Sequence, residues 1–208
     1  MPVERLRRAA RALALLAVAA PLLVGPGAAR AQAAPAATAP PAPATLAVCG
    51  SCHGADGNAT IAHWPSLAGQ PRVFIETQLV LIREGLRDVP EMKAVVAGLS
   101  DAQIGALATY YAARTPALHA GPVDAARAER GAAKARQGGC GSCHLPDYAG
   151  QQQVPRLAGQ NEAYLVASMK QFRDHPGPGR DTVMASTLRG ASDADLADLA
   201  HHLAHFRR

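Results

Sequence analysis

The chain has 208 residues, of which 49% are hydrophobic and only 4% aromatic, and its formal net charge is +5. A basic balance of this kind would suggest binding to nucleic acid or to an anionic membrane. Residues 1–33, however, hold five arginines against one glutamate, so only +1 of the net charge belongs to the rest of the chain. We therefore expect no nucleic-acid partner.

Residues 1–33 have the pattern of a secretory signal peptide. Arginines precede an apolar run over residues 12–24, and residues 31–33 offer a small-x-small cleavage pattern. The apolar run is too short to span a bilayer. Because Arg7 and Arg8 are not followed by a hydrophobic pair, we favour the general secretory route over the twin-arginine route. We expect a periplasmic protein with no stable membrane span once the signal is cleaved.

A stretch rich in proline and alanine follows, over residues 34–44, and predicts an extended tether. From residue 45 onward the sequence repeats itself with a period of 91, measured from Cys49 to Cys140. The linker between the copies is expected near residues 115–123, where two prolines and a glycine occur. The predicted domains are residues 45–118 and 119–208.

Each copy contains the string Cys-Gly-Ser-Cys-His, and the two strings use all four cysteines of the chain. Two thiols three residues apart, followed at once by histidine, are typical of c-type haem attachment. A zinc ribbon would need roughly 15 to 20 residues between its pairs, whereas Cys52 and Cys140 are 88 positions apart. A thioredoxin-like dithiol would need a sheet. We therefore predict two covalent haem c groups, held by Cys49, Cys52 and His53 and by Cys140, Cys143 and His144.

Helical periodicity follows each motif, and no stretch alternates like a strand, so the predicted class is all-α. Ser100 and Ser192 are expected to cap the last helix of their copies. A core stripe is expected at Ile75, Leu79 and Ile82 and at Leu165, Met169 and Phe172. Because aromatic residues are scarce and each unit is small, we expect buried porphyrins to supply apolar volume and folding to depend on haem attachment.

An iron held by one histidine can stay open, or it can be closed by a second histidine or by a methionine. Met92 precedes Ser100 by eight residues, and Met184 precedes Ser192 by eight, each in a predicted loop. We predict these methionines as the second axial ligands, which raises the reduction potential and favours electron transfer over oxygen or peroxide binding. Met169 lies on a helical apolar stripe and is assigned to the core.

Two prolines have a predicted role in the haem sites. Pro65 and Pro155 follow their histidines by twelve and eleven residues. In small c-type cytochromes a proline carbonyl at this distance accepts the other ring N–H of the ligand histidine, which fixes the ring and raises its basicity. A simple turn proline is the alternative.

Two other pairs are less specific. Arg83 and Arg173 occupy matching positions and could pair with haem propionates, although surface arginines on a helix fit equally well. His201 and His205 have a spacing that can bind a metal, but the sequence places no carboxylate or cysteine beside them, so we expect an amphipathic helix end.

The paired CGSCH motifs, the repeated P-x-LAGQ segments and a methionine eight residues before a capping serine resemble the dihaem cytochrome c4 family, over residues 45–208. The resemblance implies two tandem class I cytochrome c domains related by a pseudo-twofold axis. It implies an electron carrier rather than an enzyme, with a quinol-oxidising cytochrome bc complex, a terminal oxidase or a dehydrogenase as redox partner. By position, His53 and Met92 would bind the first iron, and His144 and Met184 the second.

Two features depart from the family pattern. The second motif continues with Leu-Pro-Asp-Tyr over residues 145–148, unlike the first, and only three lysines are present, so a lysine-rich docking ring is not expected. Two alternatives stay open. The chain could be the dihaem subunit of a periplasmic dehydrogenase, such as a flavocytochrome sulfide dehydrogenase, or a dihaem peroxidase-type enzyme, which would need an open iron.

Overall fold

The structure is a computed structural model that describes residues 40–118 and 121–207. The predicted signal peptide and most of the predicted tether lie outside these ranges. The described residues form nine α-helices and no strand, which confirms the all-α class, with one isolated antiparallel bridge between Gln151 and Val154. Among these helices none is long and apolar enough to cross a membrane.

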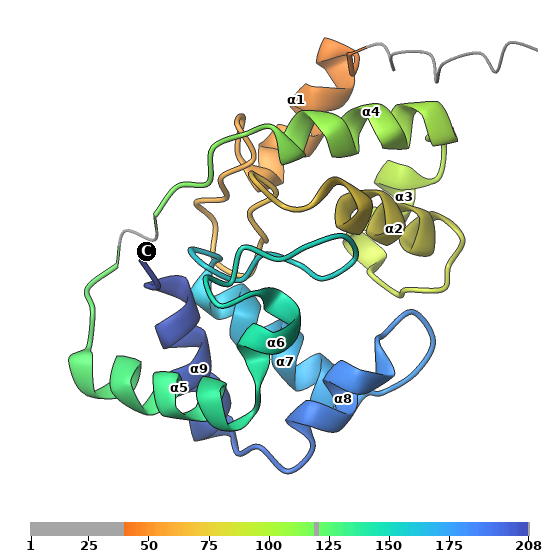
Figure 1. Ribbon diagram of the computed structural model, residues 1–208. Helices are drawn as coiled ribbons and strands as arrows, with labels where there is room; N and C mark the ends of the chain where they lie inside the picture. Colours follow the sequence, from red (N-terminus) through yellow and green to blue (C-terminus); the bar gives the residue numbers. More distant parts are fainter. Residues whose placement is uncertain (1–39, 119–120, 208) are drawn as a thin grey trace, which may run out of the picture. The chain divides into compact units, whose positions relative to one another are not determined.

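Residues 40–118, called the first repeat, contain four helices. They are α1 (Pro43–His53), α2 (Arg72–Arg83), α3 (Pro90–Val96) and α4 (Asp101–Ala112). The helices α2 and α4 pack against each other (Figure 1) and bury Ile75, Leu107 and Tyr111 between them. Because proline is well tolerated in a first helical turn, α1 begins at Pro43, two residues before the predicted start of the domain.

Residues 121–207, called the second repeat, contain five helices. They are α5 (Ala125–Gln137), α6 (Cys140–His144), α7 (Glu162–Asp174), α8 (Thr182–Leu188) and α9 (Asp193–Ala204). The last of these packs against both α5 and α7 (Figure 1). Gly131 lets α5 lie close to α9, since a Cβ atom at this position would be 2.1 Å from the carbonyl oxygen of Asp198 in α9.

The two predicted helix caps are confirmed. Ser100 accepts a hydrogen bond from the backbone of Gln103, and the side chain of Gln103 accepts one from the backbone of Ser100. Ser192 and Asp195 form the same reciprocal pair at α9. Each capping box fixes where the last helix of its repeat begins.

Each repeat has its own small apolar core. The predicted stripe residues Ile75, Ile82, Leu165 and Met169 are buried, and Met169 belongs to the core of the second repeat as predicted. The stripe residues Leu79 and Phe172 are partly buried against the same cores. The cores therefore lie on the side of α2 and α7 that the sequence indicates.

A tyrosine exchange explains why the two haem motifs continue differently. In the first repeat a Cβ atom at Gly57 would lie 2.7 Å from the ring of Tyr111. In the second repeat Tyr148 stands at the position of Gly57, because the carbonyls of both residues accept from the leucine of the following Leu-Ala-Gly-Gln segment. Leu203 then takes the place of Tyr111, since each carbonyl accepts from the glycine of that segment. The same space is thus filled from opposite sides.

Candidate haem sites

One cavity of about 1310 Å³ lies beside the two cores and is lined by residues of both repeats. Its volume exceeds the roughly 300–1,000 Å³ that is typical of a site for one small ligand. Seven of the eight residues predicted to hold haem line this cavity, namely Cys49, His53, Met92, Cys140, Cys143, His144 and Met184. The eighth, Cys52, lies one helical turn after Cys49 in α1.

The two motif histidines end their helices and are buried. His53 closes α1 and His144 closes α6, with exposed fractions of 5% and 4%. The Nδ1 atom of His53 lies 2.8 Å from the carbonyl oxygen of Pro65, and that of His144 lies 2.8 Å from the carbonyl oxygen of Pro155. Since a carbonyl oxygen can only accept, Nδ1 carries the proton and Nε2 keeps a free lone pair in each neutral ring.

Burial sets the charge state of these groups. It lowers the pKa of His53 and of His144, and the proline carbonyls oppose that shift only in part. Burial also raises the pKa of the Cys49 and Cys140 thiols. Both imidazoles are therefore neutral near pH 7, as a metal-binding imidazole must be, and both thiols are protonated.

The residues fit a porphyrin-bound iron. The Nε2 atom of His53 is buried and has no hydrogen-bond partner among the described residues, an arrangement that costs free energy unless a ligand takes up the lone pair. Apolar side chains from α2, α4, α7 and α9 form much of the cavity wall, and they include Ile75, Leu107, Leu165 and Leu199. The thiols, the histidines and the wall together match the requirements of haem c.

The two candidate methionine ligands lie in short helices, so the predicted loops are wrong. Met92 is in α3 and Met184 is in α8, and both are partly buried at the cavity. Helix α8 begins where Asp181 accepts a hydrogen bond of 2.8 Å from the backbone N–H of Met184. Seven residues are too few to show a helical period in the sequence. A histidine could also close the second iron, but His175, nine residues before Met184, is exposed and does not line the cavity.

Arg83 and Arg173 do not face the cavity. Arg83 donates to Asp101 at 2.8 Å and to the carbonyl of Leu99 at 2.9 Å, and so ties α2 to the start of α4. Arg173 makes the matching bonds to Asp193 and to a backbone carbonyl at the start of α9, both at 2.8 Å. Of the two alternatives for these arginines, the structure favours a place on the helix surface, because both guanidinium groups hold helix ends together.

Two other arginines line the cavity and were missed by the sequence reasoning. Arg87 donates to Gln78, and Arg180 donates to Gln171 at 3.0 Å. Neither arginine has an ion-pair partner within residues 40–118 and 121–207. The pKa of Arg180 lies below its usual value, mainly because the group is partly buried and to a lesser extent because Arg87 is a nearby like charge. Two like charges in one wall suit the carboxylates of a ligand. The sequence does contain a pattern that points to these arginines, because the Gln-x₈-Arg spacing of Gln78 and Arg87 recurs 93 residues later.

The two histidine environments differ in one aromatic residue. The ring of Trp64 meets the ring of His53 edge to face, with centroids 5.7 Å apart. At the matching position before Pro155 the second repeat has Val154. The two histidines therefore have different neighbours, although their hydrogen bonds to the backbone are the same.

Contrary to expectation, a carboxylate does lie beside His201 and His205. The Oε2 atom of Glu162 is 2.9 Å from Nδ1 of His201, and the ligand atoms of all three residues lie within 4.8 Å of one another. Nε2 of His201, however, accepts the backbone N–H of Asp124 at 2.9 Å, and Arg127 pairs with Glu162 at 2.9 Å. With both ring nitrogens of His201 engaged, this cluster joins α5, α7 and α9.

Sequence comparisons match both repeats to known proteins. The family described as cytochrome c matches residues 128–207, and the family described as cytochrome c oxidase, cbb3-type, subunit III matches residues 36–110. A cytochrome c4 of Pseudomonas aeruginosa is 33% identical over 171 residues, which cover 77% of this chain and 84% of that protein. A thiosulfate dehydrogenase electron acceptor of Thiomonas intermedia is 34% identical over 173 residues, covering 78% and 80%.

Structural comparison gives the same relationship. Reduced cytochrome c4 from Pseudomonas stutzeri matches with a TM-score of 0.72 at 30% identity, over 81% of this chain and 100% of that one. A thiosulfate dehydrogenase from Marichromatium purpuratum, in its as-isolated form, matches with a TM-score of 0.65 at 29% identity, over 75% of this chain and 36% of that one.

Proposed function

We propose that this chain, which belongs to the dihaem cytochrome c4 family, carries electrons in the periplasm from a respiratory donor to a terminal oxidase or another acceptor. It is an electron-transfer protein with two cytochrome c domains and two covalently bound haem c groups. The main support for the proposal is that one cavity is lined by a histidine and a methionine from each repeat, which are the candidate iron ligands. We place the domain boundary in the linker over residues 115–123.

The proposed iron ligands are His53 and Met92 in the first repeat and His144 and Met184 in the second. Haem, when bound, supplies a one-electron iron couple. The histidine Nδ1–H groups donate to Pro65 and Pro155, which fixes the ring planes and makes Nε2 a stronger donor to a metal. Cys49 and Cys52, and likewise Cys140 and Cys143, supply the thioether sulfurs.

Methionine ligation of both irons would distinguish an electron carrier from a catalyst. A thioether ligand raises the reduction potential and leaves no position for oxygen or peroxide. Met92 and Met184 lie in matching short helices at the cavity, so both repeats have a candidate for the closing ligand. A dihaem peroxidase would need one of these positions open, which makes that alternative the weaker one.

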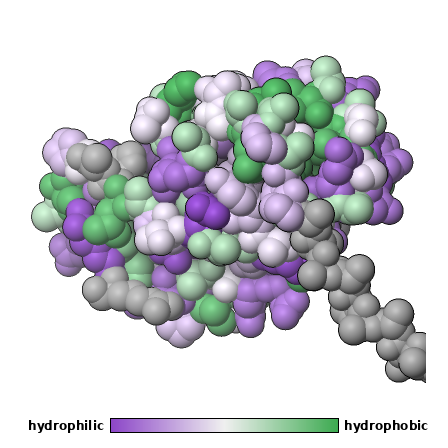
Figure 2. All heavy atoms as spheres, turned by 90° about the horizontal axis from the view of Figure 1, so that it is seen from above, coloured by the Kyte–Doolittle hydropathy of each residue, from purple (hydrophilic) through white to green (hydrophobic). Residues whose placement is uncertain are grey.

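The cavity rim has features of a docking surface for redox partners. Val48, Val95 and Val183 line the cavity and are exposed by 54%, 39% and 65%. On the face drawn in Figure 2, hydrophobic residues lie in patches between hydrophilic ones. With only three lysines in the chain, apolar contact is the better candidate for partner recognition than a ring of positive charge.

A thiosulfate dehydrogenase is the second candidate donor. Two relatives are named thiosulfate dehydrogenase electron acceptor, and one similar structure is that of a thiosulfate dehydrogenase. This candidate gives the dehydrogenase alternative a definite form, in which the chain takes electrons from a catalytic subunit.

Stopped-flow reduction distinguishes these donors. The oxidised holoprotein is mixed with a quinol-oxidising cytochrome bc complex and quinol, or with a thiosulfate dehydrogenase and thiosulfate, and haem reduction is followed optically. The carrier proposal expects fast reduction by the bc complex and reoxidation by a terminal oxidase. Reduction by the thiosulfate enzyme alone would establish the second candidate. Peroxide turnover with no reduction by either donor would contradict both.

A further inference from the structure

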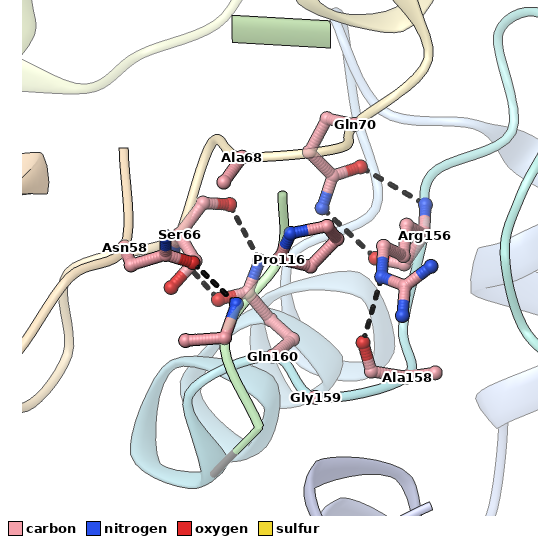
Figure 3. A pocket seen from close by; sticks show the side chains of 10 residues that line it. Asn58, Ser66, Ala68, Gln70, Pro116, Arg156, Ala158, Gly159 and Gln160 are labelled. Carbon is pink, nitrogen blue, oxygen red and sulfur yellow. Dashed lines mark hydrogen bonds between the residues drawn. The ribbon is translucent and has the colours of Figure 1, made fainter. Parts of the chain in front are cut away.

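Two buried glutamines join the repeats in a reciprocal way. Gln70 and Gln160 end the two Leu-Ala-Gly-Gln segments, and each is only 4% exposed. The amide of Gln70 donates to the carbonyl of Arg156 and accepts from its N–H, both at 2.9 Å. The amide of Gln160 donates to the carbonyl of Ser66 at 2.9 Å and accepts from its N–H at 2.7 Å. Figure 3 shows both amides facing the backbone of the opposite repeat.

The two residues that the glutamines contact, Ser66 and Arg156, directly follow Pro65 and Pro155. The peptide unit between Pro65 and Ser66 accepts the His53 Nδ1–H on its carbonyl and donates its N–H to Gln160. The peptide unit between Pro155 and the next residue does the same for His144 and Gln70. A single peptide plane therefore lies between the histidine of one repeat and the glutamine of the other.

A peptide bonded at both ends is polarised by both bonds. An acceptor at its N–H group draws electron density toward its carbonyl oxygen, and hydrogen bonds in such a chain strengthen one another by about 10–30% each. A more negative carbonyl oxygen accepts more strongly from Nδ1–H, which raises the basicity of the imidazole. A more basic imidazole stabilises the oxidised iron and lowers the potential.

We propose that Gln70 and Gln160 are positioning residues, each of which tunes the iron site of the opposite repeat through the peptide that its amide clamps. The inference rests on the proposed role of His53 and His144 as iron ligands. It assigns Gln160 to the first haem and Gln70 to the second, the reverse of their places in the chain.

Neither ligand binding nor simple docking accounts for this arrangement. The space among these side chains, lined by Ser66, Gln70, Arg156 and Gln160, has a volume of about 10 Å³ and is too small for anything larger than one water. A docking contact requires only that buried amides be satisfied. Here each amide oxygen accepts from the N–H group of the one peptide whose carbonyl also holds the histidine, and it does so in both repeats.

The test compares Gln160→Met and Gln70→Met with Gln137→Met, an exposed residue at the end of α5. The reduced holoproteins are studied by NMR, which resolves amide exchange and follows each assigned haem in a redox titration. Gln160→Met should speed exchange of the Ser66 amide by about tenfold, as for the loss of one ordinary hydrogen bond, and raise the potential of the first haem alone. Gln70→Met should do the same for Arg156 and the second haem.

The crossed pattern decides the outcome. A change confined to the haem of the mutated repeat, equal changes in both haems, or no change beyond that of Gln137→Met would overturn the proposal. If a variant fails to fold, the wild-type protein still gives an answer, because the Ser66 and Arg156 amides must exchange as slowly as helix interiors although neither lies in a helix. Rapid exchange there would overturn it. An error in the ligand assignment would show separately, as histidine and methionine signals of the wild type that are not those of iron ligands.

Discussion

Removing the first haem should unfold the first repeat. The perturbation is Cys49→Ser with Cys52→Ser, which removes both attachment points. Half of the 1310 Å³ cavity is about 655 Å³. At roughly 24 cal/mol per Å³ of enclosed cavity, an empty and dry site of this size would cost at most about 16 kcal/mol. Native domains have only about 5–15 kcal/mol of stability, so even part of this cost, with water entering the open site, is enough to loosen the native packing of the first repeat.

Amide hydrogen exchange measures this directly. We expect α2 and α4 to lose protection in the double variant while α7 and α9 keep most of theirs, so that the second repeat serves as an internal control. The matched variant, Cys140→Ser with Cys143→Ser, should reverse the pattern. Absorption spectra confirm that one haem is missing in each protein. Native protection of α2 and α4 in a protein that lacks the first haem would show that the first repeat folds without haem.

Three further predictions concern single side chains. Met92→Ala and Met184→Ala should each lower one of two potentials and let the reduced protein bind one equivalent of carbon monoxide; unchanged redox titrations in both variants would refute methionine ligation. Ser192→Ala should lower the free energy of unfolding by about 1 kcal/mol, measured by denaturant titration, and a neutral result would mean that the cap is redundant. Lys134 and Ser192 lower the pKa of Asp195 to about 2. The ionised Asp195 therefore stabilises the fold fully above about pH 4, and this stabilisation is lost as the pH falls toward 2. Asp195→Asn should flatten the dependence of the melting temperature on pH in that window, and an unchanged slope would contradict the pairing of Asp195 with Lys134.

The internal repeat explains how much of the fold the sequence predicts. Apolar residues at helical spacing identify α2 and α7, and the capping serines identify the starts of α4 and α9, because these signals are local. Helices α3 and α8 have seven residues each and were predicted as loops. Their formation depends on the proline or aspartate at their first turns and on packing at the cavity, which no short pattern shows.

In the candidate site too, the features that depend on local sequence were predicted and those that depend on packing were not. The motif residues and the proline partners of the histidines come from spacing along one segment. The sequence left two roles open for Arg83 and Arg173, because a matching repeat position shows only that two residues are equivalent and not which way they face. Arg83 and Arg173 hold helix ends, whereas Arg87 and Arg180 line the cavity.

The reciprocal glutamines were visible only as part of a repeated string. Each one acts on a residue 86 or 94 positions away in the other repeat. Contacts of that range follow from how the two repeats meet, and one sequence carries no record of it. The carboxylate of Glu162 beside His201 was missed because the two residues lie 39 positions apart on different helices of the second repeat.

In the proposed carrier, methionine closes both irons. Carbon monoxide titration of the fully reduced wild-type holoprotein tests this closure, because a closed iron has no position for the gas. We predict two haems per chain and an absorption spectrum that carbon monoxide leaves unchanged at both. Binding of one or two equivalents of carbon monoxide to the native protein would show that one or both irons are open and would overturn the assignment of methionine ligands.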